Sequence, residues 1–140
     1  MRMILIISGV LFALLLGAGG VGYIWWRASG EELIEAAQQA RDEGRALGET
    51  TNNAGCVASA MERIADCEGL RCEVPAQAFL AGCLASSEAT PGFCTGVPRK
   101  REIVETVRWR AGICDAEQLS ADGSCGRLLK AVQEFCFPDS

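Results

Sequence analysis

The sequence predicts an all-α protein in which disulfide bonds hold about four short helices together as two hairpins. All eight cysteines lie between Cys56 and Cys136, and a spacing of eleven positions joins Cys56 to Cys67 and Cys72 to Cys83. Eleven residues advance a helix by about three turns, so the two cysteines of each such pair share one helical face. The cysteine pattern therefore predicts helices that are crosslinked side to side.

The spacing also predicts which cysteines pair. Two antiparallel helices in the first half would place Cys67 opposite Cys72 and Cys56 opposite Cys83, because the connection between them is short. The second half repeats the spacing of eleven more loosely, and its pairs are assigned by analogy. The four predicted disulfides are Cys56–Cys83, Cys67–Cys72, Cys94–Cys136 and Cys114–Cys125. Eight cysteines allow 105 connectivities, so this pairing is a hypothesis.

The even number of cysteines in a small domain favours disulfides over free thiols, and thus an oxidising compartment. The chain has no histidine and no Cys-x2-Cys pair, which zinc sites use to place two ligands on one turn. We therefore expect no metal site and no cofactor. A thiol redox protein or a metal-handling protein is the alternative interpretation of the same cysteines.

Residues 1–27 are predicted to form a transmembrane signal anchor that contacts membrane lipid. Met3 to Trp26 contains no charged residue, and as a helix it would span about 36 Å, enough to cross a hydrocarbon core of about 30 Å. Tyr23 and Trp25 stand near its end, where aromatic side chains suit the lipid–water interface. A slight bias of basic residues favours a cytoplasmic amino terminus. The cysteine domain would then be periplasmic or extracellular.

Cleavage of this segment as a signal peptide is the competing interpretation. Ile4 to Leu16 has the length of a signal-peptide apolar region, and Ala18 to Gly20 resembles a cleavage site. Cleavage would release a small cysteine-rich effector or inhibitor. In the anchored form, a stripe of small residues four positions apart makes self-association of the segment possible. The stripe consists of Gly9, Ala13 and Gly17.

Residues 28–53 are predicted as a helical stalk or linker before a cysteine-rich helical domain over residues 54–140. The stalk helix should run from Gly30 to about Leu47, with Gly44 and Gly48 weakening it. We favour a spacer that lifts the domain off the bilayer. The alternative is an interaction helix that packs on the cysteine domain or pairs with another copy.

Within the domain, apolar periodicity predicts helices over residues 54–67, 75–87, 99–114 and 124–136. Pro75 should open the second helix and Ser124 should cap the fourth. The second helix should bury Phe79, Leu80, Cys83 and Leu84, and the fourth should bury Leu128, Leu129, Val132 and Phe135. The third helix should bury a side formed by Ile103, Val104, Val107, Ala111 and Cys114. Trp109 lies toward the edge of that side; we favour core packing for it over an exposed partner contact.

The run Cys56, Cys67, Cys72, Cys83 resembles the twin Cys-x9-Cys helix–coil–helix proteins, although the spacing here is ten residues. That resemblance covers 28 residues. It implies a disulfide-stapled helical hairpin of the kind found in assembly factors and small structural subunits. The whole chain, with its short anchor and Ala- and Gly-rich composition, looks like a bacterial envelope protein.

The sequence predicts no catalytic residues. The absence of histidine removes the commonest general base, and no phosphate-cradling glycine loop is present. The net charge is −5, and basic residues cluster only from Arg99 to Arg101, so nucleic acid is not an expected partner. We therefore expect a non-catalytic module at the cell envelope that binds an unidentified protein or has a structural role.

Overall fold

The computed structural model describes residues 20, 30–121 and 123–139. The chain divides into two compact units, Met1–Ile34 and Glu35–Ser140. The predicted anchor over residues 1–27 lies outside the described residues, apart from residue 20. No helix among the described residues is long and apolar enough to cross a membrane.

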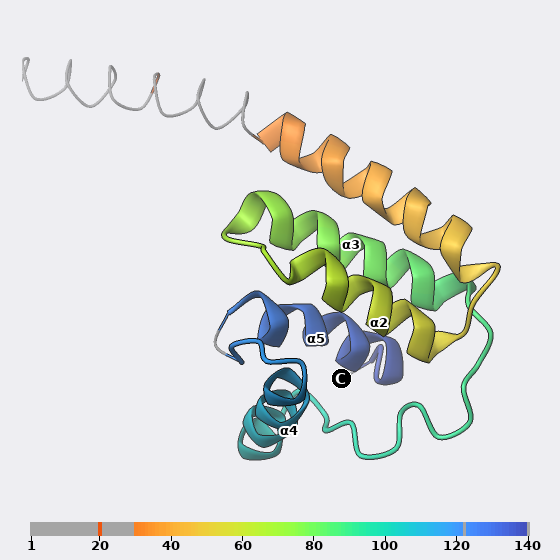
Figure 1. Cartoon of the computed structure of the whole chain (residues 1–140), viewed down its shortest axis with the longest axis vertical. Coiled ribbons are helices and arrows are strands. Elements are labelled where there is room, and N and C mark those ends of the chain that lie inside the picture. Colours follow the sequence, from red (N-terminus) through yellow and green to blue (C-terminus); the bar gives the residue numbers. More distant parts are fainter. Residues whose placement is uncertain (1–19, 21–29, 122, 140) are drawn as a thin grey trace, which may run out of the picture. The chain divides into compact units, whose positions relative to one another are not determined.

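The second unit is all-α, as predicted (Figure 1). Residues 30–48 are helical, and the part of this helix from Glu35 onward belongs to the second unit. The named helices that follow are α2 (Asn53–Ile64), α3 (Leu70–Ser86), α4 (Ile103–Ala116) and α5 (Ser124–Cys136). The structure contains the same four disulfides that the spacing predicts, and no cysteine is free.

Helices α2 and α3 form the first hairpin and lie side by side (Figure 1). Asn52 caps α2, since its side-chain oxygen accepts a hydrogen bond from the Gly55 N–H at 2.9 Å. Gly69 stands just before α3 with a φ of 85°, a backbone conformation that glycine adopts without steric cost. The Cys56–Cys83 disulfide joins the two helices within the core, where both cysteines are fully buried.

The predicted start of α3 at Pro75 is wrong, because the helix begins five residues earlier, at Leu70. The Gly69 carbonyl accepts hydrogen bonds from the N–H groups of Cys72 and Glu73 and so closes the first turn. The Cys67–Cys72 disulfide ties this turn to the end of the preceding segment. Pro75 has no backbone N–H, so it removes one hydrogen bond near the amino terminus of the helix.

Helix α5 packs against α2 and α3 and completes the core. The core combines aliphatic side chains with buried cysteines rather than many large residues. Its largest fully buried apolar side chains are Ile64, Leu80, Leu84, Leu128 and Leu129. The predicted buried sides of α3 and α5 are therefore largely confirmed, whereas Phe135 on α5 remains 40% exposed. Ser124 does not cap α5; its hydroxyl donates to the Cys67 carbonyl at 3.3 Å instead.

Helix α4 packs against α5, but only part of its predicted side is buried. Thr106 and Cys114 are its buried residues, whereas Ile103, Val104 and Val107 are 72%, 58% and 62% exposed. The Cys114–Cys125 disulfide fixes the rotation of α4 by turning Cys114 toward α5. Cys114 is eleven positions from Ile103 and so lies on the predicted side, which is buried at Cys114 and exposed in the first turns of the helix.

The helix over residues 30–48 packs closely against α3 through glycines. A Cβ atom on Gly44 would lie 2.1 Å from the Phe79 carbonyl oxygen, and one on Gly82 would lie 2.2 Å from the Arg41 carbonyl oxygen. The Ser86 hydroxyl of α3 also donates to the Arg45 carbonyl at 2.9 Å. Residues 35–48 are therefore part of the domain rather than a spacer, and a boundary at residue 54 lies too late.

Replacing Gly44 with alanine is expected to destabilise this helix contact, although alanine is the better helix former. The new Cβ would collide with α3 backbone, and such overpacking costs about 1–3 kcal/mol. Gly112 on α4 is the matched control, because a Cβ there would meet nothing within 4 Å. In chemical denaturation, G44A should be less stable than wild type by about 1–3 kcal/mol. G112A should be more stable than wild type by about 1 kcal/mol. Equal stabilisation in both variants would show that the helix does not pack on α3.

Candidate binding surfaces and the polar contacts that position them

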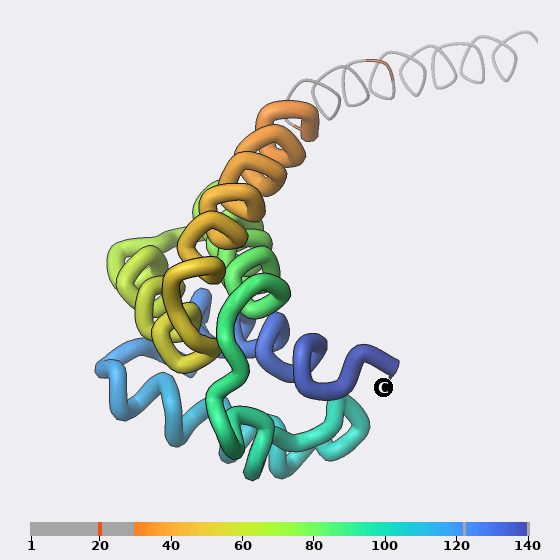
Figure 2. The backbone as a smooth tube through the Cα atoms, turned by 90° about the vertical axis from the view of Figure 1, so that its right-hand side faces the viewer, coloured from red at the N-terminus to blue at the C-terminus, as the bar shows by residue number. Residues whose placement is uncertain are grey.

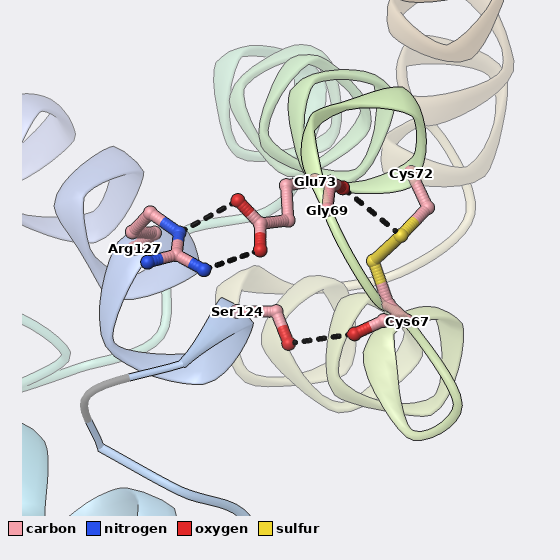
Figure 3. Close-up of polar contacts among 6 residues, drawn as sticks. All are labelled: Cys67, Gly69, Cys72, Glu73, Ser124 and Arg127. Carbon is pink, nitrogen blue, oxygen red and sulfur yellow. Dashed lines mark hydrogen bonds and ion pairs between the residues drawn. A yellow bond between two sulfur atoms is a disulfide. The ribbon is translucent and has the colours of Figure 1, made fainter.

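An ion pair links α3 to α5 at the carboxyl end of the first hairpin connection (Figure 3). Glu73 is only 4% exposed, and its carboxylate accepts two hydrogen bonds from one edge of the Arg127 guanidinium. The Arg127 Nε donates to Glu73 Oε2 at 2.6 Å, and Nη2 donates to Oε1. This two-point contact lies near the Cys67–Cys72 disulfide and fixes the register of α5 against α3.

The Glu73–Arg127 pair predicts a loss of stability in acid. The hydrogen bond from Arg127 and its charge hold the pKa of Glu73 below its usual 4.5, against the opposing effect of burial. A lowered native pKa stabilises the fold above the unfolded pKa, and this contribution is lost as the pH falls through the native pKa. The free energy of unfolding should therefore fall below about pH 4.5 in wild type, and less steeply in E73Q. The control E68Q, at an exposed carboxylate, should retain the wild-type slope; an unchanged slope in E73Q would contradict the assignment.

A buried amide links α5 to α4 and to the segment that precedes α4. Gln133 is 1% exposed, and its Nε2 donates to the Pro98 carbonyl at 3.0 Å and to Thr106 Oγ1 at 3.1 Å. Its Oε1 accepts from Arg110 Nη2 at 2.7 Å. One side chain thus orients both α4 and the chain leading into it. Sequence pattern alone does not reveal this group, because nothing in it distinguishes Gln133 from an exposed polar residue on a helix.

Trp109 lies at the edge of an apolar groove rather than on an open surface. It is partly buried and packs against the core, in agreement with the favoured interpretation. The groove has a volume of about 330 Å³ and no charged residue in its lining. Its walls include Val57 of α2, Trp109 and Ile113 of α4, and Leu129 and Val132 of α5. The fluorescence of Trp109 should therefore be sensitive to changes in the packing of α4.

The most exposed apolar surface of the described domain is on the opposite flank of α4. Ile103, Val104 and Val107 are adjacent in the first turns of the helix and all face solvent. Other exposed large apolar residues among the described residues, such as Ile34 and Leu70, lie on other elements. Clustered exposure of this kind is typical of an interaction site, whereas single exposed apolar residues are ordinary.

The cysteines hold segments of the domain together as four disulfides. All eight are oxidised, and no group of three or more potential metal ligands occurs among the described residues. The fold and its surfaces thus define a small disulfide-rich helical domain. The chain matches no protein-family model, and neither a curated protein nor a solved structure is similar to it at the level searched.

Proposed function

We propose that this chain is a non-catalytic binding module that is held at the outer side of a membrane by its amino-terminal segment. The observation that carries the proposal is the complete pairing of the eight cysteines as four disulfides across a helical domain. Disulfides persist in oxidising compartments and compensate for the small core of a domain of this size. The uncharged stretch from Met3 to Trp26 supports a membrane anchor.

A binding role is supported by the surface of α4. Its aliphatic cluster is exposed, and burying it against a partner would be favourable. Resemblance of the first hairpin to helix–coil–helix proteins points the same way, since those proteins act in assembly or as small subunits. The protein would therefore act by binding a partner at the envelope. Its disulfides would maintain the arrangement of helices that presents the α4 surface.

The two lysines allow a direct test of location. Lys100 and Lys130 are the only lysines in the chain, and both lie in the disulfide domain. Their side chains are 32% and 60% exposed, so an amine-reactive reagent can reach them. In intact cells, a membrane-impermeant amine reagent should label the membrane-bound full chain. Labelling only after permeabilisation would place the domain in the cytoplasm and refute the proposal, and recovery of a shortened soluble chain would favour a secreted protein.

A further inference from the structure

We infer that the Cys67–Cys72 disulfide is a site of thiol–disulfide exchange, which a low-molecular-weight thiol with an ammonium group reaches from a hollow beside Cys67. The exchange leaves the small thiol bonded to the Cys67 sulfur and releases Cys72 as a thiolate. This covalent modification does not depend on the binding function proposed above. The inference rests on the accessibility of the disulfide, the position of Cys72 in α3 and the residues that line the hollow.

Burial protects two of the four disulfides from a dissolved thiol. Their cysteines are at most 1% exposed: Cys56, Cys83, Cys114 and Cys125. The cysteines of the other two disulfides, Cys67–Cys72 and Cys94–Cys136, are only partly buried. Exchange requires direct attack of a thiolate on a disulfide sulfur. In the folded protein it is therefore limited to these two disulfides.

The chain around the two partly buried disulfides differs. Phe93 and Phe135 directly precede the two cysteines of the disulfide that ends α5, and they contact each other edge to face with ring centroids 6.0 Å apart. Residues 68–71, which follow Cys67, are instead all exposed. Among them, a Cβ added to Gly69 would meet nothing within 4 Å. An aromatic pair thus flanks one disulfide, whereas the chain beside Cys67 is open to water.

The helix termini favour Cys72 as the sulfur that leaves. Cys72 lies in the first turn of α3, where the N–H groups of the helix carry partial positive charge. A thiolate is stabilised at this end of a helix, and a stabilised thiolate leaves faster. Cys136 is the last residue of α5, where the helix dipole opposes a thiolate. We therefore expect exchange at Cys67–Cys72, with the attack on Cys67.

A hollow of about 430 Å³ lies next to the residue that is attacked. Its lining contains Cys67 but not Cys72, and Ser120 and Ser124 contribute hydroxyl groups to it. The Ser124 hydroxyl donates to the Cys67 carbonyl at 3.3 Å and so holds Cys67 at the edge of the hollow (Figure 3). Sites for small molecules commonly have volumes of about 300–1,000 Å³. The hollow therefore suits a small polar thiol.

The charges of the hollow favour a cationic thiol. Glu73 and Arg127 both line it and offset each other through their two-point contact. Glu68 also lines the hollow, and no basic residue forms an ion pair with it among the described residues. Its carboxylate can therefore attract the ammonium group of an aminothiol. Because Glu68 is exposed, this attraction should change the rate of exchange only a few fold.

The exchange is reversible and needs no other reactant. The thiolate of the small thiol bonds to the Cys67 sulfur, the bond between Cys67 and Cys72 breaks, and Cys72 leaves with the electron pair. Once protonated, Cys72 can donate to the Gly69 carbonyl oxygen, which lies 3.3 Å from its sulfur in the disulfide (Figure 3). Cys72 thus stays in the first turn of α3, where its thiolate can attack Cys67 again and expel the small thiol. The buried Cys56–Cys83 disulfide keeps α2 and α3 joined throughout.

Brief exposure of the oxidised full chain, in a non-ionic detergent, to the aminothiol cysteamine tests the site, with excess N-ethylmaleimide to stop the reaction. Peptide mapping should find cysteamine on Cys67 and the maleimide on Cys72, at least about tenfold faster than any reaction at Cys94 or Cys136. Equal rates at the two disulfides, or initial attachment of cysteamine to Cys72, would overturn the inference. Circular dichroism should retain the helical signal after modification, and its loss would contradict a reversible site in a folded domain.

Two thiols of similar length test whether the reagent uses the hollow. Cysteamine carries an ammonium group where 3-mercaptopropionate carries a carboxylate. The ratio of their rates at Cys67 should fall about threefold in E68Q and stay unchanged in E62Q, which alters an exposed carboxylate that lines a different hollow. Comparing ratios within each variant removes the intrinsic difference in reactivity between the two thiols. An unchanged ratio in E68Q would overturn the assigned role of the hollow.

Discussion

The double variant C94A/C136A is expected to unfold with a free energy about 4 kcal/mol smaller than that of wild type. This disulfide joins residues 42 positions apart, the longest separation of the four, and connects the segment before α4 to the end of α5. In the chain-entropy account, a crosslink stabilises the native state by restricting the unfolded chain, and the effect grows with the size of the closed loop. Denaturant titration of the purified chain measures the change.

The double variant C67A/C72A is the matched control for this prediction. Its disulfide joins residues only five positions apart, and all four of these cysteines are partly buried, so the two pairs differ mainly in loop size. Its loss is expected to cost about 2 kcal/mol. Equal losses in the two double variants would show that loop size does not determine how strongly these disulfides stabilise the protein.

Gln133→Leu is expected to be the most damaging single substitution outside the cysteines and the aliphatic core. Leucine has a similar volume but neither donates nor accepts, so the Pro98 carbonyl, Thr106 and Arg110 would each lose a buried partner. A buried polar group without a partner costs about 1–3 kcal/mol, so a total near 3 kcal/mol is a conservative expectation. The free energy of unfolding from denaturant titration gives the value.

The control for Gln133 is the same chemical change at an exposed helical position. Gln38→Leu replaces a solvent-exposed amide on the helix over residues 30–48, where the expected effect is within about 0.5 kcal/mol. Comparable effects of Q133L and Q38L would mean that the buried amide does not hold α4 and α5 together. In that case the orientation of α4 would need another explanation.

The cysteine spacing allowed the disulfide framework to be predicted because it depends on helical geometry alone. A spacing of eleven keeps Cys56 and Cys67 on one face, and a short connection then leaves few antiparallel partners for them. Apolar periodicity similarly identified the buried side of α3, where Phe79 and Leu80 are 2% and 0% exposed. Local periodicity and burial agree in this hairpin, so the sequence predicted it correctly.

The orientation of α4 could not be predicted in this way. The residues that face α5 include Thr106, Arg110 and Cys114, a stripe at a spacing of four with polar members. Their partners, Gln133 and Cys125, lie on another helix, so the preference depends on tertiary contacts that hydropathy does not report. Ile103, Val104 and Val107 therefore stay exposed in the first turns of α4, although hydropathy favours burying them.

The packing role of Gly44 and Gly48 was also not predicted from the sequence. Gly44 and Gly48 lower helix propensity, and propensity alone predicts only a weakened helix at these positions. Their spacing of four is the one signal that could have indicated a close helix contact, because it places two residues without side chains on one face. Gly44 packs against Phe79 and Gly48 against Ser86 of α3, so the predicted spacer is part of the domain.

Peptide mapping of the native full chain, alkylated without prior reduction, tests most directly whether crosslinks between helices define this protein. The structure predicts no alkylated cysteine and four linked peptide pairs, with Cys56 joined to Cys83 and Cys114 joined to Cys125. Alkylation of all eight cysteines, or a bridge between Cys56 and Cys67, would contradict both the fold and the oxidising location proposed for it.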